Sequence, residues 1–313
     1  MSSLLFPGQG SQTVGMGLEF YENFDLVKKI FKLADERLDF PISKMILEGP
    51  SEQLQLTKNT QPAILVVSYS IFKVLRDEFN FDLKSIKYFA GHSLGEYSAL
   101  VCSGALEFND ALYLLHERGK AMQNAVPVNK GSMIAILGLE LEEINNLLKN
   151  NVSSEGICEI ANDNAHGQVI ISGNKEVLDK FKITLKNKNI KHIPLKVSAP
   201  FHCSLMQPAA EVMKNKIDII KFSDPAFEIV ANVTAKAVKE THIIKKLLID
   251  QIFSTVRWRE SLIYMSKSGV KNFIEIGPGK ALTGMAKRTI KNSNCFSINS
   301  IADIKNLINE SKK

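Results

Sequence analysis

Ser93 lies in a stretch whose residue types and spacing suit nucleophilic chemistry, Gly91-His92-Ser93-Leu94-Gly95-Glu96. The G-x-S-x-G pattern is typical of a nucleophile elbow, in which two glycines let the chain turn sharply and hold the serine hydroxyl out. The apolar run 86–90 before it predicts a strand, and 96–101 after it predicts a helix. A helix N-terminus beside the hydroxyl favours developing negative charge. The stretch therefore predicts an active site with Ser93 as the nucleophile.

The alternative is that this five-residue match arises by chance in an ordinary loop. The flanking strand and helix are the context that the motif requires, so they favour catalysis. His92 adjoins Ser93, but neighbouring side chains on a tight turn point apart, and we expect His92 to be structural. The base for Ser93 should come from a distant segment of the chain.

His202 is the best candidate for that base. It lies in the loop 198–202, between a predicted strand and a helix that begins near Leu205. The other histidines are less suitable, because they lie on a solvated helix face, at the start of a strand or in polar stretches. These are His116, His192, His166 and His242. Cys203, next to His202, is expected to be a packed thiol.

Arg118 lies in the middle of the apolar face of a predicted helix, 110–124. Burying an unpaired charge is costly, so its guanidinium must find a partner or reach solvent. One interpretation is a structural salt bridge to a carboxylate of the protein. The other is that Arg118 lines a cleft and binds a carboxylate of the substrate, which its fork geometry suits.

Two glutamines lie where predicted elements begin or end. Gln9 belongs to the turn 7–10, which follows a short strand at 3–6 and either holds a ligand or is a plain turn. Gln61 precedes a predicted helix, 62–78, with Pro62 in its first turn. It either projects from the helix start toward a substrate or caps the helix.

Composition is that of a soluble globular protein of 313 residues, with 45% hydrophobic and 23% charged residues. No apolar run is long enough to span a membrane, and no secretory pattern opens the chain. Four widely spaced cysteines suit a reducing compartment and predict neither a disulfide framework nor a metal site. The net charge of +6 comes from scattered lysines, which disfavours nucleic-acid binding.

Residues 127–198 predict a small domain. The pattern there is a strand, a helix, two strands, a helix and a strand, which is the βαββαβ order of a ferredoxin-like unit. Asn162 and Asn164 are expected in a turn between its middle strands. Residues 1–126 and 199–313 then form a larger α/β domain, in which strand, glycine turn and helix recur at 273–280.

Taken in order, five segments make the chain similar to the malonyl-CoA:acyl carrier protein transacylases. They are the run 6–12, the elbow 91–96, Arg118, the Phe201-His202 loop and the run 276–279. The resemblance covers nearly the whole chain. It implies an α/β-hydrolase-like parallel-sheet core with an inserted ferredoxin-like domain. It also implies transfer of malonyl from coenzyme A to the phosphopantetheine thiol of an acidic holo acyl carrier protein.

The same resemblance implies roles for individual residues. Ser93 would be the nucleophile and His202 its base, oriented by the backbone carbonyl of Gln251 instead of a carboxylate. The N–H groups of Gln9 and Leu94 would form the oxyanion hole.

The resemblance also assigns the substrate-binding side chains. Arg118 would hold the malonyl carboxylate, and Phe201 would narrow the space around the substrate α-carbon. Gln61 is a further substrate-binding candidate, from its place before the predicted helix. No metal and no resident cofactor are expected. We expect a monomer in the cytoplasm, or in an organelle if a transit peptide has been removed, that supplies fatty acid synthesis.

Two other functions compete with transfer. A serine thioesterase or hydrolase shares the elbow, but it requires an acidic partner for the histidine, and no acid between Ser93 and His202 recommends itself. A non-catalytic module that binds carrier protein would not need the serine, the distant histidine and the buried arginine together.

Overall fold

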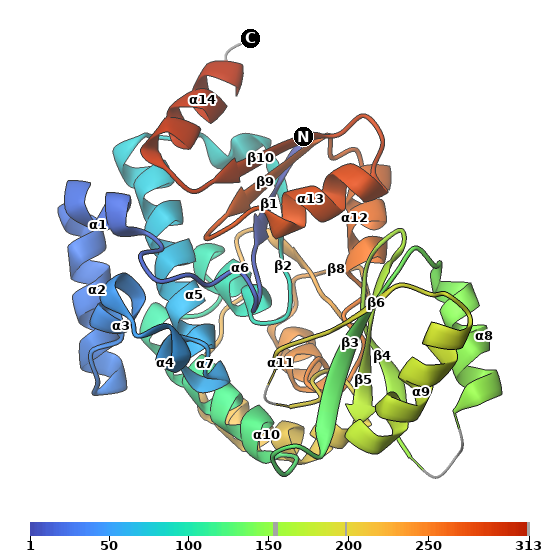
Figure 1. Cartoon of the computed structure of the whole chain (residues 1–313). Coiled ribbons are helices and arrows are strands. Elements are labelled where there is room, and N and C mark those ends of the chain that lie inside the picture. Colours follow the sequence, from blue (N-terminus) through green and yellow to red (C-terminus); the bar gives the residue numbers. More distant parts are fainter. Residues whose placement is uncertain (153–155, 198, 312–313) are drawn as a thin grey trace.

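Parallel strands form the centre of the computed structural model, which describes residues 1–152, 156–197 and 199–311 (Figure 1). Six strands form one sheet in the order β10-β9-β1-β2-β7-β8, and only the edge strand β8 is antiparallel to its neighbour. Their bounds are β1 (Ser2–Phe6), β2 (Ile86–Gly91), β7 (Glu228–Val230), β8 (Ala237–Val238), β9 (Asn272–Ile276) and β10 (Asn294–Ile298).

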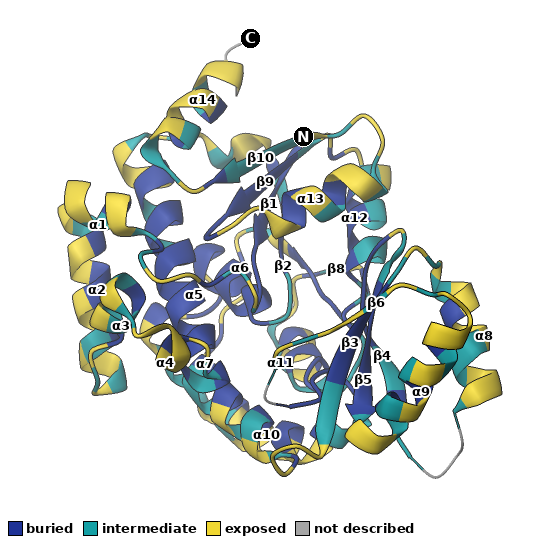
Figure 2. Ribbon diagram, viewed as in Figure 1, coloured by how far each residue is buried: buried dark blue, intermediate teal, exposed yellow. Residues whose placement is uncertain are grey.

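Side chains of this sheet alternate between two buried faces. In β1, Leu4 and Phe6 pack in one cluster of apolar residues, whereas Leu5 packs in another. Buried parallel strands are covered by helices on both faces, and Figure 2 shows β1 and β9 buried among helices whose outer sides are exposed. The α/β core that the sequence predicted is confirmed.

The larger cluster lies between the sheet and most of the helices. These are α1 (Leu18–Asn23), α2 (Asp25–Leu38), α3 (Ile42–Glu48), α4 (Ser51–Leu54), α5 (Thr57–Lys73), α6 (Gly95–Cys102), α7 (Phe108–Asn124), α10 (Gln207–Ile219), α11 (Thr241–Asp250) and α14 (Ile301–Ser311). The second cluster is covered by α12 (Trp258–Lys267) and α13 (Ala281–Thr289). Short helical turns are η1 (Val74–Glu78), η2 (Leu83–Ser85) and η3 (Ser204–Met206). No helix in the described ranges is long and apolar enough to cross a membrane.

The predicted βαββαβ unit forms a separate antiparallel sheet in the order β4-β5-β3-β6. Its elements are β3 (Gly131–Leu137), α8 (Leu141–Asn151), β4 (Cys158–Ala165), β5 (Gln168–Asn174), α9 (Lys175–Asn187) and β6 (His192–Pro194). Helices α8 and α9 cover one face of this sheet, and the other face joins the main apolar cluster. The order confirms the ferredoxin-like prediction. The domain boundaries stay a prediction, and Ser198 at the second boundary lies outside the described residues.

The prediction of a turn at Asn162 and Asn164 is wrong. Both residues lie within β4, which continues to Ala165. The pairing of β4 with β5 is interrupted twice here, between Ile160 and Asn162 and between Asp163 and Ala165. Irregular pairing of this kind turns side chains away from the regular alternation, and it lets polar residues remain in a strand.

The predicted start of the helix near Pro62 is also wrong, because α5 begins at Thr57 and Pro62 is inside it. Proline has no N–H to donate to the carbonyl of Lys58, four residues earlier. His116 of α7 bonds that carbonyl instead, with 2.9 Å between Nδ1 and the oxygen. His116 is therefore half-buried between two helices and does not lie on the solvated face that the sequence predicted.

Helix α6 begins directly against the end of β1. A Cβ atom on Gly95 would lie 2.1 Å from the carbonyl oxygen of Phe6 and 2.8 Å from that of Pro7. Backbone atoms cannot move aside as a flexible side chain can. Glycine at this position lets the helix that follows Ser93 pack onto the neighbouring strand.

We expect Gly95→Ala to lower the free energy of unfolding by about 2 kcal/mol, the usual cost of forcing extra atoms into a packed region. Chemical denaturation of wild type and variant measures this difference. Gly284→Ala is the matched control, because Gly284 is in α13 and its added Cβ meets nothing within 4 Å. The control should be neutral or stabilising. Equal effects of the two substitutions would show that the contact with β1 is unimportant.

Candidate active site

The loops that follow β1, β2 and β7 meet at one edge of the large sheet. They carry Gln9, Ser93 and Asn232, respectively, just after the carboxyl ends of the strands. In open α/β sheets this edge is where ligands bind. The site begins there, and distant segments complete it.

Ser93 and His202 meet although they are 109 positions apart. Ser93 Oγ lies 2.8 Å from Nε2 of His202, and Nδ1 of His202 lies 2.8 Å from the backbone oxygen of Gln251. A carbonyl only accepts, so Nδ1 carries the proton and Nε2 is free to accept from the hydroxyl. Ser93 has φ 54° and His202 has φ 58°. These are left-handed backbone conformations that residues other than glycine rarely adopt. Other bonds must hold both residues in place.

Asn232 holds the serine corner. Its Oδ1 accepts from the N–H of Ser93 at 2.8 Å, and its Nδ2 donates to the carbonyl of Gly91 at 2.7 Å. The side chain thus satisfies the turn on both sides of Ser93. Asn232 was not among the residues predicted from the sequence, because a single asparagine after a three-residue strand carries no motif.

Arg118 reaches the same serine from α7. Its Nη2 donates to Ser93 Oγ at 3.1 Å and to Oε1 of Gln251 at 2.8 Å, and its Nη1 donates to Oε1 of Gln61 at 2.7 Å. Arg118 is 1% exposed. No carboxylate lies within 4.0 Å of it in the described part of the chain, and its Nε has no hydrogen-bond partner there. The structural salt bridge that the sequence left open is therefore absent from the described residues.

Gln61 is buried inside α5 and faces α7. The prediction that it lies at the start of a helix is wrong. Helices α5 and α7 approach closely here, since a Cβ on Gly119 would lie 2.5 Å from the Cα of Lys58. This approach brings Gln61 and Arg118 together.

A small cleft of about 100 Å³ joins these groups. The small sheet and the chain after it contribute its outer wall. The lining residues are Gln9, Gln61, His92, Ser93, Leu94, Arg118, Met122, Met133, Asn162, Leu195, Val197, Phe201 and His202. Every site residue that the sequence predicted, except Gln251, lines this cleft. Gln251 bonds both Arg118 and His202.

His92 has a structural partner, as expected, and the partner is Asn164. Nε2 of His92 lies 2.8 Å from Oδ1 of Asn164, so the elbow is tied to β4. Asn162, two residues earlier, lines the cleft. The sequence predicted a turn at both asparagines. The interruptions in strand pairing that orient them leave no recognisable pattern in the sequence.

The oxyanion-hole candidates, Leu94 and Gln9, line the same cleft as the serine. Leu94 is the residue at the start of α6, and Gln9 is in the loop after β1. That loop packs tightly on the elbow, because a Cβ on Gly8 would lie 2.6 Å from the carbonyl oxygen of His92. The side chain of Gln9 donates to Thr57 Oγ1 at 3.3 Å, which fixes the loop from α5.

Burial determines the charges of the site. Burial, together with the charge of Arg118, lowers the pKa of His202 to about 3, so its imidazole is neutral near pH 7. Burial raises the pKa of the Glu96 carboxyl to about 7. It also lowers the pKa of Arg118, but a guanidinium stays charged in proteins. The site therefore combines a neutral base with a buried cation.

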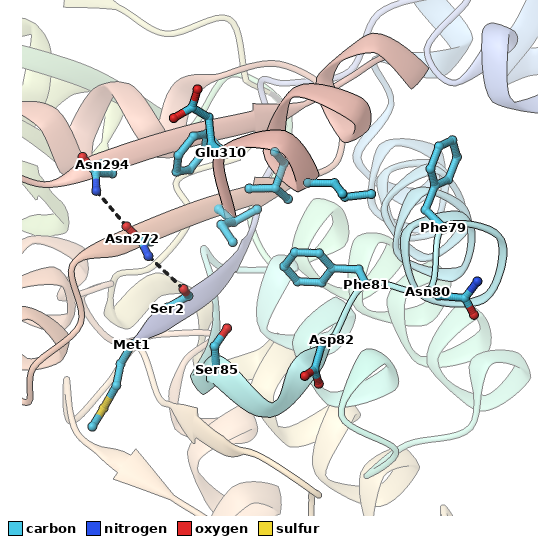
Figure 3. Close-up of a pocket in the computed structure, with 14 residues that line it drawn as sticks. Met1, Ser2, Phe79, Asn80, Phe81, Asp82, Ser85, Asn272, Asn294 and Glu310 are labelled. Atoms are coloured by element: carbon cyan, nitrogen blue, oxygen red, sulfur yellow. Dashed lines mark hydrogen bonds between the residues drawn. The ribbon is translucent and has the colours of Figure 1, made fainter. Parts of the chain in front are cut away.

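A larger cavity of about 730 Å³ lies at the opposite edge of the sheet (Figure 3). It is lined by the first residues of β1, β9 and β10, where Asn294, Asn272 and Ser2 are joined by hydrogen bonds. Aromatic side chains such as Phe79 and Phe81 form another wall. No histidine, cysteine, lysine or arginine is among the described residues that line this cavity, in contrast to the cleft at Ser93. No cluster of three or more metal-ligating side chains occurs among the described residues.

Comparisons with known proteins agree with this geometry. The profile of the acyl transferase domain matches residues 4–309. A malonyl CoA-acyl carrier protein transacylase of Bacillus subtilis (strain 168) is 42% identical over 287 residues, which are 91% of this chain and 89% of that protein.

Solved structures show the same likeness. An acyl-carrier-protein-S-malonyltransferase of Bartonella henselae has a TM-score of 0.96 and 38% identity, over 100% of this chain and 99% of that one. A malonyl-transacylase in complex with its type II PKS acyl-carrier protein has a TM-score of 0.94 and 37% identity, over 99% of both chains. The resemblance seen in the sequence is confirmed, as are the fold and the assignment to acyltransferases. The chain belongs to the acyl transferase domain family, and within it to the malonyl CoA-acyl carrier protein transacylases.

Proposed function

We propose that the protein transfers malonyl from coenzyme A to the phosphopantetheine thiol of an acyl carrier protein through a malonyl ester on Ser93. One observation carries this proposal. Oγ of Ser93 lies between the imidazole of His202 and the guanidinium of Arg118, and it is within hydrogen-bond distance of both. A nucleophile is thus placed beside a buried cation that no carboxylate of the described residues contacts directly.

In the first half-reaction, Oγ of Ser93 attacks the thioester carbon of malonyl-CoA while Nε2 of His202 takes the hydroxyl proton. The carbonyl oxygen becomes negative, and the N–H groups of Leu94 and Gln9 stabilise it at the N-terminus of α6. The C–S bond then breaks, and the proton on Nε2 goes to the departing sulfur. Coenzyme A leaves as a free thiol.

The second half-reaction reverses these steps with a new thiol. The phosphopantetheine sulfur gives its proton to Nε2 of His202 and attacks the ester carbon of malonyl-Ser93. The Ser93 oxygen recovers the proton as its bond to carbon breaks. Because the imidazole is neutral at the start of both halves, the same nitrogen accepts a proton each time.

Arg118 is the proposed selector for malonyl. Its Nη2 already contacts the serine oxygen that carries the acyl group, and its Nε has no partner among the described residues. A carboxylate at the far end of a short acyl group can therefore accept charge-assisted bonds from the fork. Phe201, 7% exposed, lines the same cleft and is proposed to limit the space at the substrate α-carbon.

The hydrolase alternative is disfavoured by the histidine. A serine hydrolase orients its histidine with a carboxylate, whereas Nδ1 of His202 faces the carbonyl of Gln251. The cleft is small, which suits exclusion of water from a waiting ester.

We infer an acidic carrier protein as the partner, because the chain has a net charge of +6. The four cysteines are unpaired, which supports a reducing compartment such as the cytoplasm. A monomeric state, the supply of malonyl for fatty acid synthesis and the domain boundaries remain predictions of the sequence.

Incubation with malonyl-CoA should give a malonyl adduct on Ser93 that carrier protein removes. Intact mass spectrometry measures the adduct, and initial rates at varied concentrations of both substrates should give the parallel lines of a ping-pong mechanism. Ser93→Ala should form no adduct. Intersecting lines without any adduct would contradict the covalent route, and release of free malonate in place of malonyl carrier would identify a hydrolase.

Arg118→Ala should lower malonyl transfer roughly ten- to a hundredfold, since a hydrogen bond to a charged group contributes about 1.5 to 3 kcal/mol. Acetyl transfer should fall far less, because acetyl has no carboxylate. The measurement is kcat/KM for both acyl-CoA substrates, with thermal unfolding to verify that the variant is folded. An equal loss for both substrates in a folded variant would assign Arg118 to stability alone.

His202 should make stability depend on pH. Its folded pKa of about 3 lies below the ordinary value of 6.5, so protonation favours the unfolded chain. The stability that the neutral ring contributes is complete above pH 6.5 and is lost as the pH falls toward 3. Between pH 7 and pH 5, wild type should lose about 2 kcal/mol relative to His202→Gln in denaturant unfolding. If the difference in free energy of unfolding between wild type and His202→Gln does not change with pH, the lowered pKa of His202 is refuted.

A further inference from the structure

Glu96 is a buried carboxylate that contacts the same amide as Arg118. It is the second residue of α6 and is 2% exposed. Its Oε2 accepts from the N–H of Asn232 at 3.0 Å and from Nε2 of Gln251 at 2.8 Å. No cationic nitrogen lies within 4.0 Å of it in the part of the chain that the structure describes. A buried anion and a buried cation therefore lie close together without touching.

The side chain of Gln251 separates the two charges. Its Nε2 donates to Glu96, to the carbonyl of Ser93 at 3.0 Å and to Oδ1 of Asn232 at 3.2 Å. These three acceptors fix the orientation of the amide, so its Oε1 faces Nη2 of Arg118. The amide thus presents a donor to the anion and an acceptor to the cation.

This separation has an electrostatic consequence. A buried guanidinium without a counter-charge is costly, and Glu96 reduces that cost through the field that it exerts on Arg118. A direct salt bridge would do the same but would occupy the donors that a substrate carboxylate needs. Placing the anion behind Gln251 compensates the charge while the fork bonds only neutral acceptors, Oε1 of Gln61, Oε1 of Gln251 and Oγ of Ser93.

We propose that Glu96 is a specificity-determining residue, a counter-charge that sets how strongly Arg118 holds the carboxylate of the malonyl group. This rests on the proposed function. An ionised Glu96 repels the incoming carboxylate and weakens its binding. The malonyl group is then held firmly enough to be selected and loosely enough to be passed on.

Tyr97 and His202 keep their charge between pH 6 and pH 8, because burial raises the pKa of Tyr97 to about 12 and lowers that of His202 to about 3. Burial also lowers the pKa of His92, which favours the neutral ring. Arg118 stays charged throughout. Burial raises the pKa of Glu96 to about 7, so it is mostly ionised at pH 8 and mostly protonated at pH 6. The counter-charge can thus be present or absent within the range where the enzyme is assayed.

Glu96→Gln tests the charge with little change in shape. Both hydrogen bonds to Glu96 end on one oxygen, and an amide oxygen can accept both. The readout is the malonyl-CoA concentration that half-saturates acylation of Ser93, followed by rapid quench and intact mass. At pH 8 this concentration should be on the order of tenfold lower in the variant, because a nearby like charge has been removed. At pH 6 the two proteins should agree, and acetyl-CoA should show no difference at either pH.

Glu275→Gln is the matched control. Glu275 is also a fully buried glutamate, but its carboxylate accepts from Thr283 and from the N–H of Leu282, away from Arg118. This substitution should alter thermal stability and leave the preference for malonyl over acetyl unchanged. A change of that preference in the control would show that any buried glutamate affects it, and would overturn the proposal.

Wild type distinguishes failure of this proposal from failure of the proposed function. If wild type forms no malonyl adduct, the proposed function fails. If it does, an unchanged malonyl preference in Glu96→Gln at pH 8, or an equal loss for both substrates, overturns the role of Glu96. If the variant does not fold, wild type alone decides, because its half-saturating malonyl-CoA concentration relative to acetyl-CoA must rise from pH 6 to pH 8.

Discussion

The whole site depends on Gln251, the residue that follows α11. Its backbone carbonyl fixes the tautomer of His202, and its side chain meets Arg118, Glu96 and the serine corner. One residue therefore couples the base to the charged groups that would select the substrate. A shift of the end of α11 would disturb both at once. Gln251 is completely buried, and its hydrogen bonds allow its amide a single orientation.

Two residues of the site are held in unfavourable backbone conformations, and the rest of the fold provides the restraint. Ser93 is fixed by Asn232, in the loop that follows β7, and by the close approach of α6 to β1. The loop of His202 is fixed from the small sheet, because Glu159 of β4 accepts from both the N–H and the hydroxyl of Ser204. Strain at a functional site persists only where the surroundings determine it in this way. The two sheets are thus both needed to bring Oγ and Nε2 together.

Local patterns in the sequence predicted the parts whose signal is local. The elbow around Ser93, the alternation of strands and helices and the apolar face that carries Arg118 each occupy one short stretch. Asn232, Asn162 and Asn164 left no such signal, because their roles arise from strand ends and interrupted pairing that bring distant segments together. The sequence predicts Gln61 at the start of a helix, because Pro62 is typical of a first helical turn. Tertiary packing allowed that proline inside α5, with His116 of α7 satisfying the carbonyl that it leaves without a donor.

The arrangement also explains how transfer can be favoured over hydrolysis without an acidic third residue. A carboxylate behind the imidazole would raise the pKa of the ring, whereas a carbonyl orients it and adds no charge. Burial and the nearby Arg118 keep the ring neutral near pH 7. In the proposed mechanism it accepts a proton only while a thiol or hydroxyl attacks. The negative charge of the site is placed on Glu96 instead, beside the arginine and away from the base. Separating the anion from the histidine in this way would leave His202 to move protons and Glu96 to balance the charge proposed to hold the substrate.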